Sequence, residues 1–213
     1  MIELVIYALL AAFIFSRLYN SLGRSTSSNI KKLTNIIDAN QEEKNIVENV
    51  ENYIYNDTDS SSIKATYEQI LQINKNFSIF NFMKGSSLVF ELVIKYYNQG
   101  NLPKLKPLLD KELYSNFVEK IKYRKEVQES IIVSIITQKI LEIKLIKDTV
   151  HIVVYFLSDQ INFIKNDKGE IISGNTSTIN KVEDIWQFKK NITFSNPKWL
   201  LTSVEYKKED NEH

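Results

Sequence analysis

The chain has 213 residues, of which 43% are hydrophobic and 25% are charged, and its formal net charge is +1. These proportions are ordinary for a globular protein with one main domain and appendages. The near-neutral charge argues against a nucleic-acid-binding protein, because such proteins usually gather a basic excess on one face. The chain has no Cys and two His. This excludes disulfides, thiolate chemistry and Cys-bearing zinc sites, and we expect no metal and no cofactor.

The N-terminal stretch Ile2–Leu18 (IELVIYALLAAFIFSRL) is apolar except for Glu3, Ser16 and Arg17. As a helix it would extend for about 27 Å, close to the hydrocarbon thickness of a bilayer. One alternative is a cleaved signal peptide, but the start lacks a positive charge and no small-residue cleavage pattern follows. A buried core helix is a further alternative. We predict a transmembrane anchor at residues 1–20.

The positive charges near this anchor predict its orientation. Arg17, Arg24, Lys31 and Lys32 all lie at or beyond its C-terminal end. By the positive-inside rule, the rest of the protein faces the cytoplasm or its topological equivalent.

Residues 21–62 read as a linker between the anchor and the main domain. Within it, Ile30–Tyr55 has a weak helical pattern with an Asn-rich middle. A docked helix and a disordered segment are both compatible with that pattern. Asn56–Ser62 (NDTDSSS) is a polar break, and it sets the predicted start of the main domain, 63–206.

The most apolar helical stretch of this domain is Ser86–Gln99 (SSLVFELVIKYYNQ). It opens on the cluster Gly85-Ser86-Ser87, a predicted N-cap, and closes on Gly100, a predicted C-cap. Apolar residues cover nearly the whole circumference between these ends. We therefore expect the rest of the domain to wrap around this helix.

A further helix is predicted after Asp110. Asp is a favoured N-cap residue, and the apolar residues Leu113, Phe117 and Ile121 follow with helical spacing.

From Ile131 onward the apolar residues alternate with period two, as in half-buried strands. Lys147-Asp148 and Asn166–Gly169 are the predicted turns. A last strand is predicted at Trp199–Tyr206, followed by a charged tail at 207–213. Helices followed by antiparallel strands indicate an α+β domain, with a curved sheet around the central helix.

The sequence contains no phosphate-binding, dinucleotide-binding, zinc-protease or Ser/His/Asp motif. His151 is either a general base or a solvent-facing strand residue, and we favour the second reading. Asp184 shares a predicted strand face with Val182, Trp186 and Phe188. It is either a base with a raised pKa or a structural residue held by a hydrogen bond or ion pair, and we favour the structural role.

An apolar cavity at the open end of the wrapped helix is the default ligand site. The tentative hydrophobic pocket is lined by Phe90, Ile94, Tyr97, Trp186, Phe188 and Trp199. The simpler reading of the aromatic residues Trp186, Phe188 and Trp199 is that they belong to the core.

The region Phe77–Glu205 resembles the bacterial and mitochondrial family of the forty-four-kilodalton inner-membrane translocase subunit. The resemblance rests on F-M-K-G-S-S…F-E at Phe82–Glu91, Q-G-N-L…L-K-P-L-L at Gln99–Leu109, F…I..R at Phe117–Arg124, D-K-G-E-I-I-S-G at Asp167–Gly174 and D-I-W-Q-F-K-K…S-N-P-K-W-L-L at Asp184–Leu201.

This resemblance implies a nuclear-transport-factor-two-like (cystatin-like) cone, in which a curved antiparallel sheet surrounds a long helix. It also implies a non-enzymatic role at the inner membrane, in preprotein translocation, chaperone tethering or membrane-protein complexes, with protein partners or lipid bound. The mitochondrial members carry a long N-terminal arm, whereas this chain has the predicted anchor and linker. We therefore expect a single-pass protein of a bacterial inner membrane with a cytoplasmic domain; the alternative is the matrix side of the mitochondrial inner membrane.

Two rival functions remain open from the sequence. One is an enzyme on the same scaffold with Asp184 as its base, which would need a polar group facing Asp184 across an open pocket. The other is a ribosome-associated structural subunit, which clustered Lys and Arg on one face would favour.

Overall fold

The computed structural model of the chain describes residues 50–55, 59–193 and 198–206. These residues belong to one compact unit, Glu48–His213. The predicted anchor at 1–20, most of the linker and the tail at 207–213 lie outside the described residues. No helix within the described ranges is long and apolar enough to cross a membrane.

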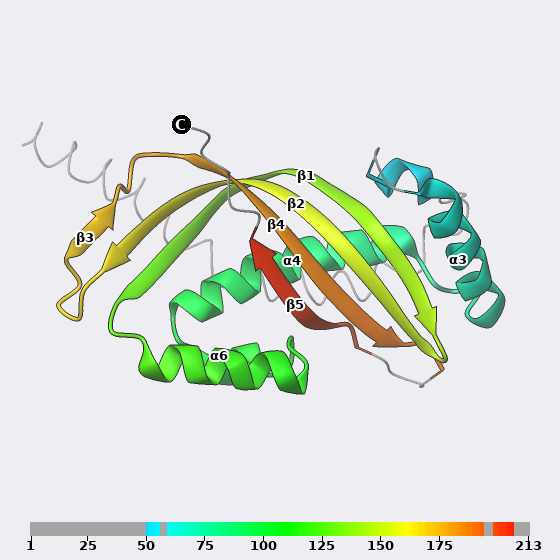
Figure 1. Cartoon of the computed structure of the whole chain (residues 1–213), viewed down its shortest axis with the longest axis horizontal. Helices are drawn as coiled ribbons and strands as arrows, with labels where there is room; N and C mark the ends of the chain where they lie inside the picture. Colours follow the sequence, from blue (N-terminus) through cyan, green and yellow to red (C-terminus); the bar gives the residue numbers. More distant parts are fainter. Residues whose placement is uncertain (1–49, 56–58, 194–197, 207–213) are drawn as a thin grey trace, which may run out of the picture. The chain divides into compact units, whose positions relative to one another are not determined.

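The described domain is α+β, as the sequence predicts, with its helices mostly ahead of its strands (Figure 1). A short 3-10 helix, η2 (Val50–Tyr53), precedes the helices α3 (Ser60–Ile73), α4 (Ile79–Asn98), α5 (Leu102–Leu105) and α6 (Lys111–Tyr123). The strands are β1 (Val127–Ile146), β2 (Thr149–Lys165), β3 (Ile171–Gly174), β4 (Asn180–Asn191) and β5 (Leu200–Tyr206). They form an antiparallel sheet in the order β1-β2-β4-β5, and β3 pairs with β2. In Figure 1 the sheet curves over α4, with α6 on the side of α4 away from the middle of the sheet.

The central helix α4 begins seven residues earlier than predicted. Its N-cap is Ser78, whose hydroxyl accepts a hydrogen bond from the Asn81 N–H at 3.0 Å. The predicted cap at Gly85-Ser86-Ser87 is therefore wrong, because these residues lie inside the helix. Inside the helix the Ser86 and Ser87 hydroxyls donate to the Met83 carbonyl, and the Gln138 side chain on β1 donates to the same carbonyl at 2.9 Å and to the Ser86 hydroxyl at 2.7 Å.

The C-terminal end of α4 is the one predicted. Gly100 adopts a φ of 63°, a conformation that Gly takes at little cost. Its N–H donates to the Tyr97 carbonyl at 3.0 Å, and the Asn101 N–H donates to the Tyr96 carbonyl at 2.9 Å. This is a Schellman motif, which satisfies carbonyls at the helix end.

The wrapping of α4 is less complete than predicted. Its fully buried residues form a single stripe at helical spacing: Ile79, Phe82, Met83, Ser86, Phe90 and Val93. Leu88 and Leu92, on the opposite side, are only partly buried. The sheet therefore buries one face of α4 rather than its whole circumference.

Both predicted turns between the strands are confirmed, at Lys147-Asp148 and at Asn166–Gly169. Gly169 has a φ of 82°. However, β1 starts at Val127 and contains register shifts between Ile132 and Ser134, Ile135 and Thr137, and Ile140 and Glu142. Each shift inserts a bulge residue, which changes the face on which the next side chains lie and bends the strand. A strict period-two pattern cannot express these shifts.

The predicted break at Asn56–Ser62 is wrong in its last part. Ser60–Ser62 form the first turn of α3, because the Asp59 carboxylate accepts hydrogen bonds from the N–H groups of Ser61 and Ser62. Just before this break, Ile54 forms a parallel bridge with Ile140 of β1, and the Tyr55 N–H donates to the Ile140 carbonyl at 2.9 Å. The end of the predicted linker is thus docked on the edge of the sheet.

The core lies between α4 and the face of the sheet that packs against it, which we call the inner face. Its centre is an aromatic cluster in which the Phe90 ring stacks on Phe156 at 4.4 Å and contacts Trp186 at 4.7 Å. This cluster is fully buried, and one of its members, Trp186, lines the cavity described next.

Candidate functional site

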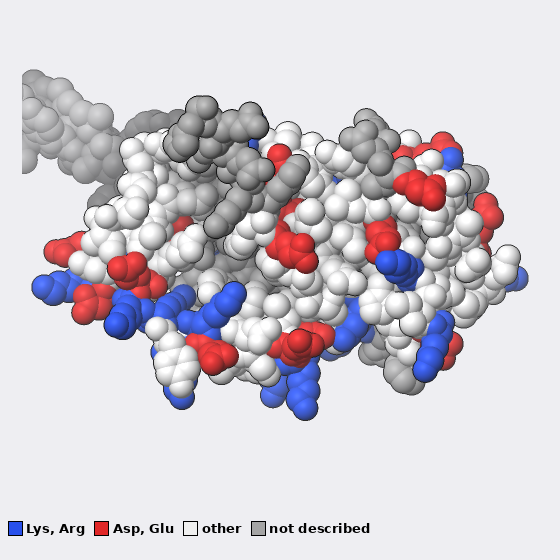
Figure 2. Space-filling view, viewed as in Figure 1, with Lys and Arg blue, Asp and Glu red and all other residues white. Residues whose placement is uncertain are grey.

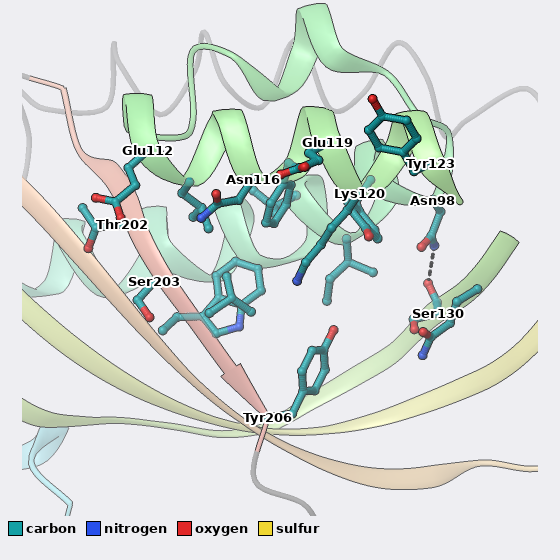
Figure 3. Close-up of a pocket in the computed structure, with 18 residues that line it drawn as sticks. Asn98, Glu112, Asn116, Glu119, Lys120, Tyr123, Ser130, Thr202, Ser203 and Tyr206 are labelled. Carbon is teal, nitrogen blue, oxygen red and sulfur yellow. Dashed lines mark hydrogen bonds between the residues drawn. The ribbon is translucent and has the colours of Figure 1, made fainter. Parts of the chain in front are cut away.

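A cavity of about 840 Å³ lies between α6, the C-terminal half of α4 and the inner face of the sheet (Figure 3). This volume is within the range of ordinary ligand pockets. The lining comes from three walls. The α4 wall is Val93, Ile94, Tyr97 and Asn98; the α6 wall is Glu112, Leu113, Asn116, Phe117, Glu119, Lys120 and Tyr123; the sheet wall is Gln128, Ser130, Trp186, Thr202, Ser203, Val204 and Tyr206.

The start of α6 is held against the sheet by Asp110. Its carboxylate accepts the Leu113 N–H at 2.9 Å and forms an ion pair with Lys189 of β4 at 2.8 Å. Burial by itself would raise the pKa of Asp110, but Lys189 and the helix N–H groups lower it below its ordinary value. The carboxylate is thus ionised at neutral pH and fixes one end of the α6 wall.

The other end of the cavity is held by Arg124 and Asn98. The Arg124 guanidinium donates to the carbonyls of Tyr97 and Asn98 at 3.1 and 3.3 Å, and so binds the C-terminal end of α4. The Asn98 amide donates to the Ser130 carbonyl on β1 at 2.8 Å, the bond drawn in Figure 3. These contacts hold α4, the end of α6 and the sheet in a fixed relation.

The cavity is aromatic inside and charged at α6. The Tyr97 and Phe117 rings meet edge to face at 4.9 Å where α4 and α6 pack. The charged lining residues are Glu112, Glu119 and Lys120, all on α6. Figure 3 shows the Lys120 side chain pointing down from α6 toward the sheet.

Next to the cavity, the inner face carries a buried polar cluster formed by Ser158, Gln160 and Asp184. The Gln160 amide donates to the Ser158 hydroxyl at 2.9 Å and to the Asp184 carboxylate at 3.3 Å. Burial raises the pKa of Asp184 to about 6, against smaller lowering effects of the Trp186 indole and the Gln160 amide. The indole N–H of Trp186 is buried beside this carboxylate.

Asp184 does not line the cavity, and its side chain is 1% exposed. Its side-chain hydrogen-bond partner Gln160 is also buried, and Tyr206, its register partner on β5, lines the cavity. A ligand in the cavity therefore does not meet the Asp184 carboxylate, and the arrangement suits a structural carboxyl better than a base.

The structure brings three of the six predicted pocket residues together. Ile94, Tyr97 and Trp186 line the cavity. Phe90 and Phe188 are fully buried in the core, and Trp199 packs against Phe82 at a ring distance of 4.4 Å. That a ligand binds there stays a prediction.

None of the residues that the sequence predicts for the pocket lies on α6 or β5, which form two of the cavity's walls. The polar face of α6, with Glu112, Asn116 and Lys120, resembled an ordinary solvated face. Ser203 and Tyr206 resembled ordinary strand residues. No local pattern indicates that these two segments face each other.

Two other candidates lie elsewhere. His151 is paired in register with Lys189, away from the cavity; desolvation, followed by the charges of Lys189 and Lys144, lowers its pKa. Among the described residues, no group of three or more His, Asp or Glu is placed to hold a metal ion. On the face shown in Figure 2, Lys and Arg are interspersed with Asp and Glu rather than gathered into one basic patch.

Comparison with known proteins adds the family. No curated protein matches the chain. The family model described as the Tim44-like domain matches residues 63–206, well over half of the chain. That range contains all of α3 except its first three residues, the helices α4 to α6 and all the strands that the structure describes, including each wall of the cavity. The chain therefore belongs to the Tim44-like domain family.

Proposed function

We propose that this protein is a membrane-anchored, non-enzymatic binding or scaffold protein of the inner membrane. It acts in protein translocation or in a membrane-protein complex, and its cavity contacts a protein partner or lipid. The observation that carries this proposal is the Tim44-like match over 63–206, because this family is associated with translocation at inner membranes. The open, partly aromatic cavity between α4, α6 and the sheet supports a binding role.

The anchoring part of the proposal rests on Ile2–Leu18 and on the basic residues that follow it. We expect the full chain to sediment with membranes and to resist carbonate extraction, with residues after Gly23 open to protease from the cytoplasmic side only. Recovery of a soluble chain trimmed at its N-terminus would instead identify a signal peptide.

One observation favours an enzyme as the second candidate, namely the Asp184 pKa of about 6. With that pKa, the deprotonated carboxylate could act as a general base near neutral pH. Against this, Asp184 is buried, bonded to Gln160 and absent from the cavity lining. We therefore place it in the supporting structure of the binding site.

The binding role can be tested by photo-crosslinking in cells. A photoreactive residue replaces Asn116, which lines the cavity, and in a matched control it replaces Lys168, which is exposed in the turn between β2 and β3. We expect the Asn116 position to crosslink one defined membrane-complex protein or a lipid, and the Lys168 position not to do so. Equal crosslinking of both positions to abundant soluble proteins would argue against the proposal.

A further inference from the structure

The outer edge of β5 is partly paired by the chain itself. β5 is the last strand in the sheet order, and β4 is its strand neighbour. On the other side, the Leu201 N–H donates to the Leu108 carbonyl and the Asp110 N–H donates to the Leu201 carbonyl, both at 2.9 Å. Leu109 and Leu201 thus form a parallel bridge, a single step of an additional strand.

This additional strand stops where α6 begins. Asp110 pairs with Leu201 and is at the same time the N-cap of α6, so the next residues turn into the helix. α6 then runs over the edge instead of along it, as Figure 3 shows. Beyond Leu201, the β5 residues Thr202, Ser203, Val204 and Tyr206 line the cavity. Within the described parts of the chain, no strand pairs with this section of the edge.

We propose that an extended peptide segment of a partner protein binds in this groove by adding a strand to the outer edge of β5, beyond Leu201. The inference rests on the proposed binding function and names its partner class. An unpaired strand edge presents backbone N–H and C=O groups that another extended chain can pair with. The short section available suits a peptide of about four or five residues, at about 3.4 Å per residue.

The lining selects the chemistry of the peptide. Alternate side chains of a strand point to opposite faces, so one set would face Ile94, Tyr97 and Trp186 and should be apolar. At the rim of the groove formed by α6, Glu112 and Glu119 outnumber Lys120, so basic side chains are favoured there. In Figure 3, Glu112 lies beside Thr202, at the end of the groove where the internal bridge stops. We expect a segment that alternates apolar and basic residues.

The opposite edge of the sheet is a poorer site for the same peptide. β1 carries three register shifts against one in β5, between Leu201 and Ser203, and bulges twist an edge away from further pairing. Part of that edge is also taken by Ile54 at Ile140. The first half of β1 exposes Ile131, Val133 and Ile136, and none of these residues lines the cavity.

The test uses the purified full chain in detergent and the fluorescein-labelled peptide acetyl-Lys-Val-Lys-Leu-Lys-amide, followed by fluorescence anisotropy. Two N-methylated peptides are compared, one methylated at its second and fourth residues and the other at its third and fifth. Successive N–H groups of a strand point in opposite directions, so one of these peptides loses the donors that face β5 and the other keeps them. We expect one to bind about tenfold more weakly than the parent peptide and the other to bind nearly as well.

Two protein variants test the location. Asn116→Trp fills the groove from α6 and should weaken binding at least about tenfold, whereas Ser115→Trp adds the same side chain on the outside of that helix and should not. Hydrogen exchange should slow at 202–206 when the peptide binds. Absence of binding to the parent chain, equal binding of both methylated peptides, or detergent-competed binding without protection of β5 would each overturn the strand-addition proposal. The last result would identify an acyl chain as the occupant.

These results are separable from the proposed function. If the peptide fails to bind while the Asn116 crosslink to a membrane protein or lipid persists, the binding function holds and strand addition is wrong. If the peptide binds as expected but no crosslink forms at Asn116 in cells, the groove is a peptide site and the proposed cellular function is wrong.

Discussion

At the residue scale, Asp184 shows how the sheet places a carboxyl group where its charge is unfavourable. It lies among Ser158, Gln160 and Trp186 with a side chain that is 1% exposed, and burial raises its pKa to about 6. The folded state therefore holds this proton more tightly than the unfolded state, in which the ordinary value near 3.8 applies. The resulting stabilisation is present below the unfolded pKa and is lost as the pH rises through the folded pKa.

This predicts the behaviour of Asp184→Asn. The amide oxygen can still accept the Gln160 hydrogen bond, but the variant has no charge to bury. Relative to the parent, its free energy of unfolding should gain about 2 kcal/mol between pH 4.5 and pH 7.5. Urea denaturation of both proteins at the two pH values measures this. If the difference in unfolding free energy between the two proteins does not change with pH, Asp184 is not a buried carboxyl with a raised pKa. If the variant is stable but has lost its cellular function, the enzyme hypothesis would be favoured.

Gln138 is the second residue on which the interior depends. Its amide donates to Met83 and Ser86 of α4, and its carbonyl accepts from the Ser87 hydroxyl at 2.7 Å. Gln138→Leu keeps a similar volume but leaves the buried Ser86 hydroxyl with fewer partners.

We expect Gln138→Leu to cost about 1–3 kcal/mol of unfolding free energy, the range for an unsatisfied buried polar group. Ser134→Ala, at an exposed position of the same strand, is the control and should cost less than about 0.5 kcal/mol. Equal stability of the two variants would mean that this network adds nothing to the packing of α4 on β1.

At the element scale, α6 is attached mainly through its first turn. Asp110 combines three contacts: the helix cap at Leu113, the ion pair with Lys189 and the backbone bond to Leu201. Its side chain contributes only the first two. Because its pKa is lowered, the stabilisation from this carboxylate is present above its unfolded pKa and is lost as the pH falls through the folded value.

Two substitutions of Asp110 distinguish the contribution of the helix cap from that of the ion pair with Lys189. Asp110→Asn keeps a capping side chain, whereas Asp110→Ala removes both cap and ion pair and should destabilise the domain by about 1–2 kcal/mol. We expect hydrogen exchange at the start of α6 to accelerate strongly in the Ala variant and weakly in the Asn variant. An identical exchange pattern in both would show that the ion pair, not the cap, holds the helix.

At the scale of the whole molecule, the compact unit extends beyond the family match at its N-terminal side. Val50 and Ile54 are both buried, and Ile54 bridges to β1. These residues precede residue 63, where the Tim44-like match begins. The segment 50–55 thus covers part of the core and of the β1 edge.

Ile54→Ala should therefore cost about 2–4 kcal/mol in the full chain, the range for emptying a buried aliphatic site. Asn52→Ala, an exposed change in the same segment whose backbone bond to Lys139 is kept, serves as the control. A fragment limited to 63–206 should fold with lower stability than one that starts at residue 48. If the two fragments unfold at the same urea concentration, the docked segment is dispensable.

Several features of this fold follow from the sequence because their causes are local. The Asn166–Gly169 turn needs only a Gly that accepts a positive φ, and the α6 cap needs only Asp110 followed by a helical segment. Gly100 ends α4 for a similar reason. The alternation after Ile131 indicates strands, and with the helices before it indicates an α+β domain. The motif resemblance likewise identified the family that the match at 63–206 bears out.

Other features depend on residues far apart in the chain. Ser86 and Ser87 lie inside α4, where their side chains bond to Gln138, more than fifty positions further along the chain. The bulges of β1 reflect how a long strand bends over α4, and no single residue type encodes them.

The candidate site belongs to this second group. Phe90, Phe188 and Trp199 were predicted to line the cavity because they are aromatic. In the structure, Phe90 and Phe188 are buried in the core and Trp199 packs on Phe82. The α6 and β5 walls face each other through contacts between distant segments, among them the bonds of Asp110 to Lys189 and Leu201 at the point where α6 begins. Burial and hydrogen-bond partners are set by contacts between distant segments, so the sequence by itself determined which elements form, and the tertiary structure decided which side chains meet around the cavity.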